Sequence, residues 1–232
     1  NAVAFSGHAH QPLTDERNVW QGSFVSIGTA SMINGGGRLF RDNATVFDYG
    51  VSPISKMPVL QTGECRQGLY VTVRGNELNV ERRDFNWGVE VGHPWQVVLG
   101  EPEHFAAQVA RIGVPAFPSG AKPVVTDDGK HYVVKFPAAG LPRAYDYEVT
   151  AVLSKGVVSR IVSQKRVYSP KCYWPERYDT NDVVCVFGRA EIPDNHESVK
   201  FVVRPMNAWG KAGGAIESVP DEYWSKGPLY PF

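Results

Sequence analysis

Two histidines stand close together near the start of the chain, in the segment Gly7-His8-Ala9-His10. Neutral imidazole binds zinc, iron, manganese and related divalent metals, so the pair is a candidate metal site. On an extended backbone residues i and i+2 point the same way, whereas a turn at Gly7 would direct the two rings at two neighbouring ions. A catalytic metal needs about three protein ligands. The spacing alone therefore leaves a second interpretation open, an incidental pair of surface histidines.

The elements around this pair are expected to be short strands. Residues 2–5 form an apolar run, which predicts a buried strand directly before the histidines, and residues 24–29 predict another strand. Residues 67–85 alternate apolar and polar side chains on either side of Gly75 and Asn76, which predicts a β-hairpin.

One helix is expected over residues 101–112, because Phe105, Val109 and Ile112 recur at helical spacing. The rest of the chain is punctuated by 23 glycines and 17 prolines between runs of valine and aromatic residues. This composition is typical of many short strands, and the predicted fold class is mainly β.

The second half of the chain predicts a domain of its own. The composition shifts to Gly, Pro, Ala and Ser at the end of the helix, so we expect one domain over residues 1–112, a linker over 113–120 and a β-sandwich over 121–232. Beyond the linker, strand-like runs separated by turns cover residues 130–136, 145–153, 157–168, 182–192 and 199–206. The tail after Gly214 is expected to pack as an irregular cap.

The first half resembles the end of a calcineurin-like metallophosphoesterase. The resemblance is carried by Gly7-His8-Ala9-His10, residues 12–17, the strand at 24–29, Gln67-Gly68-Leu69 and Arg82-Arg83-Asp84-Phe85. It implies the C-terminal part of an α/β sandwich that binds two divalent metal ions (Mn, Fe or Zn) and hydrolyses phosphate mono- or diesters by a two-metal mechanism. It further implies that His8 ligates one ion and His10 the other.

The family's earlier motifs, which supply the remaining ligands and the catalytic histidine, should all precede Gly-His-x-His and do not occur in this chain. We therefore expect a C-terminal fragment that is inactive without an N-terminal part, which would be its partner, and we assign it no catalytic residue. The competing hypothesis is a non-catalytic β-sandwich module that docks a glycan, a partner protein or the cell surface. A periplasmic or extracellular location is suggested only by the sandwich.

The segment Phe201 to Lys211 resembles the penultimate strand of a fibronectin type III domain, because Asn207 and Gly210 form its Asn-x-x-Gly turn. Val199 stands where such domains commonly place a tyrosine. Pro205 cannot donate to a β-ladder, which predicts an edge or a bulge at that point. An immunoglobulin-like sandwich is compatible with both departures.

Several further features are given structural interpretations. Asn195-His196-Glu197 copies part of a ligand motif but follows Asp194 and is expected to be a turn. Four aromatic residues could form a sugar-binding set: Tyr173, Trp174, Tyr178 and Trp209. We interpret them as structural, because aromatic side chains in a small sandwich more often fill the core. Cys65, His93, His104 and His131 have no partner at ligand spacing, and whether Cys172 pairs with Cys185 is left open.

The composition narrows the possible partners. The 24 basic and 24 acidic side chains balance, so nothing predicts a nucleic-acid or anionic-membrane partner. No run approaches the roughly 18 apolar residues of a membrane-spanning helix. Three cysteines are too few for a disulfide scaffold.

Overall fold

The computed structural model describes residues 2–7, 13, 15–29, 66–85, 88–140, 142, 144–169, 182–194 and 196–220. These residues fall into two compact units, which comprise residues 2–113 and residues 114–220. The chain is mainly β, as the sequence predicts. Within the described part, no helix is long and apolar enough to cross a membrane.

The first unit contains a small three-stranded sheet in the order β1-β3-β2. It consists of β1 (Val3–Ser6), β2 (Val19–Gln21) and β3 (Val25–Gly28), with a 3-10 helix (Glu16–Asn18) leading into β2. β1 runs parallel to β3, and β2 runs antiparallel to it. Alternate residues of β2 and β3 are buried, as period-2 alternation requires.

A second sheet of the first unit contains the predicted hairpin. Its strands are β4 (Gln67–Arg74), β5 (Glu77–Asp84), β6 (Val89–Glu90) and β7 (Trp95–Val98), and β5 pairs with the other three. The turn falls at Gly75, whose φ of +62° is a conformation that glycine adopts without steric cost. The predicted hairpin is confirmed.

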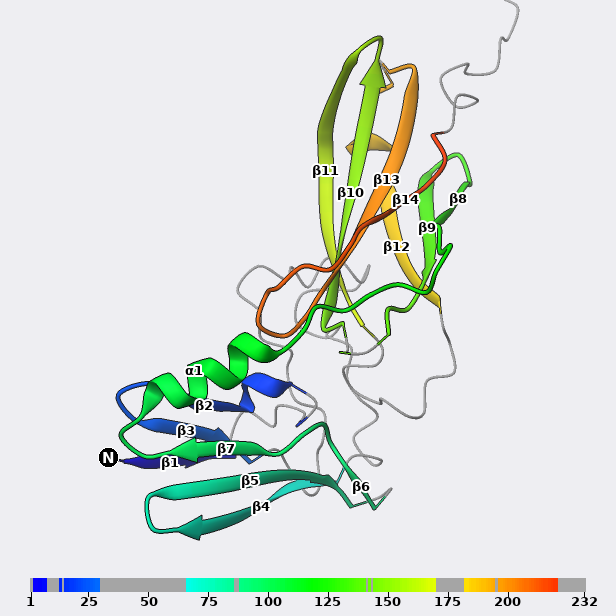
Figure 1. Ribbon diagram of the computed structural model, residues 1–232. Coiled ribbons are helices and arrows are strands. Elements are labelled where there is room, and N and C mark those ends of the chain that lie inside the picture. The colour runs from blue at the N-terminus through cyan, green and yellow to red at the C-terminus, as the bar shows by residue number, and fades with distance from the viewer. Residues whose placement is uncertain are drawn as a thin grey trace, which may run out of the picture. The chain divides into compact units, whose positions relative to one another are not determined.

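The predicted helix is also confirmed, as α1 (Pro102–Arg111). A proline in its first turn, Glu103 near its positive end and Arg111 in its last turn all suit a helix. The helix lies over β7 and β2 (Figure 1). Its buried residue Phe105 places its ring 5.0 Å from that of Trp95, which anchors the helix to the second sheet.

The expectation of a buried strand at residues 2–5 was wrong in one respect. A strand forms there, but it is not buried, since the side chain of Phe5 is 55% exposed. The reason is its position, because β1 is the edge of its sheet and β3 is its only neighbour among the described strands. An apolar run in the sequence predicts a strand, but it does not show whether other elements of the fold pack over that strand and bury it.

The second unit is built from two sheets. One has the order β12-β9-β8, from β8 (Val124–Asp127), β9 (His131–Pro137) and β12 (Asp182–Gly188). The other has the order β11-β10-β13-β14, from β10 (Asp146–Lys155), β11 (Val158–Tyr168), β13 (Ser198–Met206) and β14 (Ile216–Glu217). Within this unit the long β10–β11 hairpin runs beside β13 (Figure 1).

Both sheets of the second unit contribute to one hydrophobic core. Phe201 of β13 illustrates this, since its ring lies 5.7 Å from that of Tyr132 on β9 and 5.2 Å from that of Phe187 on β12. On β12, for example, Val183, Cys185 and Phe187 face this core, whereas Val184 and Val186 are exposed. The second unit therefore buries the inner faces of its two sheets against each other.

The strands predicted in the second half are present, but β8 was not predicted, and two of the other predictions need correction. The strand expected over 182–192 ends at Gly188, where a 3-10 helix (Arg189–Glu191) follows. The tail is not an irregular cap throughout, because Ile216 pairs with Val203 and makes β14. Pro205 lies beyond this pairing, but the edge of β13 is not open there, because the carbonyl of Pro205 accepts a 2.8 Å hydrogen bond from the amide of Gly213 and Met206 bridges to Ala212. Its missing N–H faces this short segment and not β10, so the proline leaves the pairing of β13 with β10 intact.

Residues assigned from the sequence to a linker contact the second unit. Phe117 packs against Phe136 and Tyr147, at ring distances of 6.4 and 6.0 Å. The carbonyl of Ala116 accepts a hydrogen bond of 2.8 Å from the amide of Gly140. The segment from residue 114 onward is thus part of the second unit's packing.

Candidate functional site

His8 and His10 lie outside the described residues, so the structure does not place the predicted ligands themselves. It does place the chain on both sides of them. Before the pair, the carbonyl of Ser6 accepts a 2.9 Å hydrogen bond from the amide of Thr29, which ties the end of β1 to β3. After the pair, Leu13 is fully buried. In the sequence, the candidate ligands therefore fall between two positions that the structure anchors, Ser6 and Leu13.

The anchoring of Leu13 is achieved by side chains from the second sheet. Its amide donates to Oε1 of Gln67 at 2.8 Å, and its carbonyl accepts from Nη1 of Arg82 at 2.9 Å. Its own side chain packs with Val91 and Leu69. Both backbone polar groups of Leu13 are therefore satisfied away from water, as burial requires.

Arg82 holds two parts of the chain at once. Besides Leu13, its Nη2 donates to the carbonyl of His93 at 3.0 Å, and the residue is only 2% exposed. The backbone at Gly92 passes so close to this guanidinium that a Cβ there would collide with Nη2. Gly92 also has a φ of +70°, so a glycine is needed for both reasons.

Gln67 and Asp84 complete this buried polar group. Nε2 of Gln67 donates to Oδ2 of Asp84 at 3.2 Å, and both residues are buried. We call Gln67, Arg82 and Asp84 the inner polar cluster. The cluster is not among the features predicted from the sequence, although the sequence contains a signal for it. On β5 the inward positions Leu78 and Val80 continue in phase to Arg82 and Asp84, and a charge at an inward position implies a buried partner.

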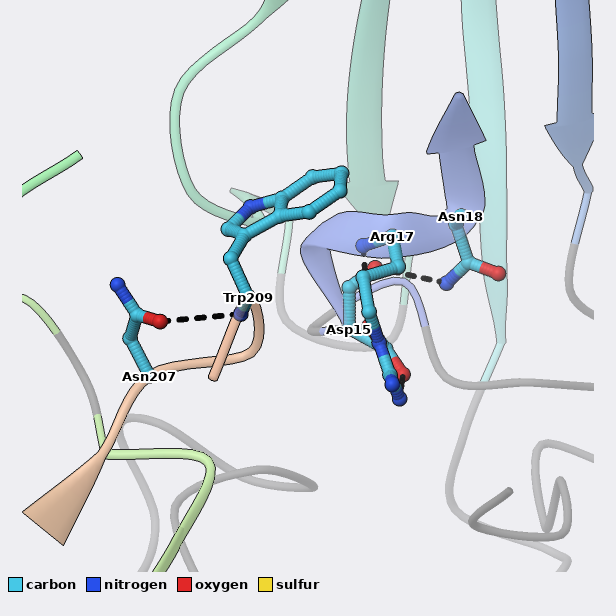
Figure 2. Close-up of polar contacts among 5 residues, drawn as sticks. All are labelled: Asp15, Arg17, Asn18, Asn207 and Trp209. Carbon is cyan, nitrogen blue, oxygen red and sulfur yellow. Dashed lines mark hydrogen bonds and ion pairs between the residues drawn. The ribbon is translucent and has the colours of Figure 1, made fainter. Parts of the chain in front are cut away.

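A second polar group lies just after Leu13, in the stretch that carries part of the family resemblance. Asp15 is buried and caps the 3-10 helix by accepting from the amide of Arg17 at 3.0 Å. Nε and Nη2 of Arg17 approach its two carboxylate oxygens at 2.9 and 2.7 Å. Nδ2 of Asn18 donates to the carbonyl of Asp15 at 3.0 Å (Figure 2). These contacts stiffen the entry into β2.

His93 is the only titratable imidazole beside the inner polar cluster among the described residues. Burial lowers the pKa of His93; the carboxylate of Glu16 opposes this change, and the charge of Arg82 adds to it. Its ring lies 4.9 Å from that of Trp95. The imidazole of His93 is therefore neutral near pH 7, so this residue adds no positive charge to that of Arg82.

The remaining candidate ligands are not brought together. No group of three or more His, Cys, Asp or Glu residues that could hold a metal ion occurs in the described part of the chain. His104 lies near Gln108 on α1, and His131 pairs with Asp128 in the turn before β9. Cys185 is buried on β12, whereas Cys65 and Cys172 lie outside the described residues.

The His196-Glu197 part of the ligand-like triplet has a structural role. Nδ1 of His196 lies 2.5 Å from the carbonyl of Pro193. Oε2 of Glu197 accepts from the amide of Gly156 at 2.8 Å, and its own amide donates to the carbonyl of Ser154. The two bonds of Glu197 fix the turn between β10 and β11, and the contact of His196 lies within the connection from β12 to β13. Asn195 lies outside the described residues.

The Asn-x-x-Gly turn of the second unit forms as predicted. Oδ1 of Asn207 accepts from the amides of Trp209 and Lys211 at 3.0 and 2.9 Å, and Gly210 has a φ of +79°. Figure 2 shows the Asn207 side chain directed at the main chain of Trp209. Tyr173, Trp174 and Tyr178 lie outside the described residues, so the aromatic set is not tested as a group.

A buried tyrosine also stabilises this unit, at a position other than the one considered from the sequence. Val199 is buried in the core. The hydroxyl of Tyr147 on β10 instead accepts a 2.9 Å hydrogen bond from the amide of Ala139, which fixes the connection between β9 and β10.

No protein-family model matches this sequence, and none of the curated proteins is significantly similar to it. The family resemblance is therefore carried by the motif residues alone.

Proposed function

We propose that residues 1–112 are the C-terminal portion of a calcineurin-like metallophosphoesterase domain and that residues 121–232 are an accessory fibronectin III or immunoglobulin-like sandwich. The complete protein hydrolyses a phosphate mono- or diester. In this chain, His8 and His10 contribute ligands to two divalent ions (Mn, Fe or Zn). The observation that carries the proposal, beside the motif itself, is the open edge of β1.

The outer edge of β1 is suited to receive another strand. The carbonyls of Ala2 and Ser6 accept from Val25 and Thr29, so the even-numbered residues of β1 direct their backbone groups toward β3. Val3 and Phe5 therefore direct theirs outward, where no described strand pairs with them. Unpaired strand edges are usually covered, blocked or kept short in proteins, and β1 is a short edge of four residues that carries no charged side chain. A preceding part of the same catalytic domain would cover this one.

Aromatic side chains on the first unit support the same conclusion. Trp20 and Phe24 are exposed and pack edge to face at 5.7 Å, and Tyr70 and Phe85 do the same at 6.0 Å. Exposed apolar patches of this kind commonly mark interaction surfaces. They favour a unit that is completed by further protein.

The donor chemistry of the histidine pair fits a shared two-ion site but does not fill it. Two imidazoles can serve two borderline divalent ions, and the other donors must come from elsewhere, since each catalytic ion needs about three protein ligands. When bound, the two ions stabilise the negative charge that develops on the phosphate oxygens. The role of this chain in the site is to hold the two imidazoles of His8 and His10 in position for the ions.

The topology of the second unit supports a fibronectin III-like sandwich. A three-stranded sheet in the order β12-β9-β8 shares its core with the four-stranded sheet β11-β10-β13-β14. The Asn207 turn follows β13, as the resemblance implies. We assign this unit an accessory role.

The test uses the longest natural form of the protein, together with the 232-residue chain. In the longer form, His8→Ala and His10→Ala should each lower the bound divalent metal and reduce turnover of an aryl phosphate at least 100-fold, with little change in melting temperature. The 232-residue chain should remain at background. Full turnover and metal content in the double alanine variant would refute the proposal. A longer form that lacks bound metal and turnover would favour the non-catalytic docking module.

A further inference from the structure

A cleft lies on the outer face of the second sheet of the first unit. It has a volume of about 440 Å³ and is lined by residues of β4, β5 and β7 and by His104 of α1. Its residues on β5 include Glu77, Asn79 and Glu81, which alternate with the inward positions of that strand. The cleft is therefore separate from the inner polar cluster, which lies on the other face of the sheet. Its volume is within the range of small-molecule sites.

The strand register places polar side chains in rows across this cleft. Thr72 on β4 pairs with Asn79 on β5, and Asn79 pairs with Gln96 on β7. Residues paired in this way lie about 5 Å apart, so a hydroxyl and two carboxamides stand side by side across three strands. Each carboxamide can donate and accept hydrogen bonds at once. Such a row suits a ligand that presents several hydroxyl groups.

The polar side chains of the cleft are held in position by their neighbours. Nδ2 of Asn79 donates to Oε1 of Glu81 at 3.2 Å, and Nη2 of Arg83 donates to Oε2 of the same carboxylate at 2.8 Å. On the other side, the side-chain amide of Gln108 bonds to both backbone groups of Gln96, which fixes α1 against β7. Groups that are already oriented lose less conformational freedom when a ligand binds.

An exposed aromatic side chain lies beside the polar row. Tyr70 pairs with Glu81 and is two residues before Thr72 on β4, so it lies on the same face as the cleft. Its side chain is 55% exposed, and its ring lies 6.0 Å from that of Phe85 and 5.8 Å from the guanidinium of Arg83. A sugar ring can stack its C–H face on such an aromatic ring while its hydroxyls bond to planar polar side chains.

We propose that this cleft binds a neutral saccharide. Each carboxylate that lines it has a guanidinium beside it, since Arg83 bonds to Glu81 and Arg74 pairs with Glu77 across the strands. The lining therefore presents no surplus of carboxylates or guanidiniums to attract an ionic ligand. A sheet face in water is ordinarily polar, but hydration alone requires neither a hollow nor an exposed aromatic ring beside it. The site needs no metal ion, so it is independent of the histidine pair. The edge of β1, to which the proposed function assigns further protein, belongs to the other sheet.

The test exposes the 232-residue chain, in EDTA, to an array of neutral, sulfated and sialylated oligosaccharides. The best neutral ligand is then titrated by calorimetry. Asn79→Ala and Gln96→Ala should each raise the Kd about 10-fold, because each removes hydrogen bonds to hydroxyls. Tyr70→Ala should raise it by about 10-fold through lost stacking, whereas Tyr70→Phe, which keeps the ring, should retain most of the affinity. The three residues are exposed or half-buried, so the melting temperature should stay close to that of the parent.

Gln164→Ala is the matched control, because it removes an exposed strand glutamine from the second unit and should leave the Kd unchanged. Three results would overturn the proposal. The first is that no neutral oligosaccharide binds, and the second is that binding is confined to sulfated or sialylated glycans. The third is an unchanged Kd in Asn79→Ala, Gln96→Ala and Tyr70→Ala, which would place the saccharide elsewhere on the chain. Since EDTA removes divalent metal, none of these results bears on the proposed phosphoesterase function.

Discussion

The two units of this chain treat their large aromatic side chains differently. In the second unit, the described aromatic residues are buried or half-buried, and the exposed large apolar residues are aliphatic, as with Val157 and Ile161. In the first unit, Phe5, Trp20 and Tyr70 are among several aromatic side chains that remain exposed. A unit that leaves aromatic rings and a strand edge in solvent resembles one side of an interface, whereas the second unit resembles a self-sufficient domain.

The same contrast extends to buried polar groups. In the second unit, Asp146 and Ser218 bond to groups 20 and 17 residues away, and Asn207 bonds to amides only two and four residues later. The first unit has local bonds of this kind at Asp15, but it also uses polar side chains to join distant segments, since the bond from Gln21 to Val98 spans 77 residues. Short-range bonds allow the second unit to complete its turns without outside help.

The largest expected difference is between separate proteins made from the two units. A protein of residues 114–232 should be a monomer that unfolds cooperatively, because its two sheets already share one core. A protein of residues 1–113 should self-associate and bind hydrophobic dyes. Light scattering after size exclusion, dye binding and thermal melts check this.

Phe5→Lys is the informative variant of the first unit, because a charge on an edge strand opposes strand addition. It should reduce association of the 1–113 protein. A compact wild-type monomer of residues 1–113 in dilute solution would contradict the contrast between the units.

The next effect concerns where the second unit begins. A protein of residues 121–232 lacks the ring of Phe117 and the bond from Gly140 to Ala116. It should be about 2–4 kcal/mol less stable than residues 114–232, from lost burial and an unpaired amide. Urea denaturation of the two proteins measures the difference. Equal urea midpoints for the two proteins would indicate that the second unit begins at residue 121, after the segment rich in Gly, Pro, Ala and Ser.

A smaller effect is expected from Asn207→Ala in the second unit. The variant leaves the amides of Trp209 and Lys211 without their acceptor, which should lower stability by about 2 kcal/mol and the melting temperature by roughly 10 °C. Gln164→Ala, an exposed change on β11, is the control and should stay within about 0.5 kcal/mol of the parent.

The smallest effect is a difference in pH dependence. Burial lowers the pKa of His93 from its usual 6.5, so its contribution to the first unit is complete above pH 6.5 and declines as the pH falls below that value. The side chain remains partly in solvent, so the change is small.

The second unit should respond only in more acidic solution. Burial would raise the pKa of Glu191, but the amide of Gly188 and the side chains of Lys165 and Ser163 together lower it from 4.5. The amides of Lys130 and His131 lower the pKa of Asp128 from 3.8. Both contributions are present above those values and are lost as the pH falls through the folded-state pKa. Unfolding of the 232-residue chain and its His93→Gln variant between pH 7 and 3 checks both units.

Local sequence patterns predicted the elements whose signals lie within a few residues. Gly75 marked the hairpin, and the spacing of Phe105 from Val109 marked the helix. The exposure of β1 could not be predicted, because it depends on whether another layer is present. The hydrogen bonds that join Leu13 to Gln67 and Arg82 were not predicted for a similar reason. These partners are 54 and 69 residues away in the sequence, and no local periodicity connects them to Leu13.

Those separations also bear on how the chain folds in time. The β10–β11 hairpin turns at Gly156, so its first pairs can form as soon as that turn exists. Closing a loop of 54 residues to bring Gln67 to Leu13 costs about 3.5 kcal/mol of chain entropy before any bond compensates it. Contacts of high sequence separation form slowly. We therefore expect the bonds that join Leu13 to Gln67 and Arg82 to form later than the local pairs of the β10–β11 hairpin.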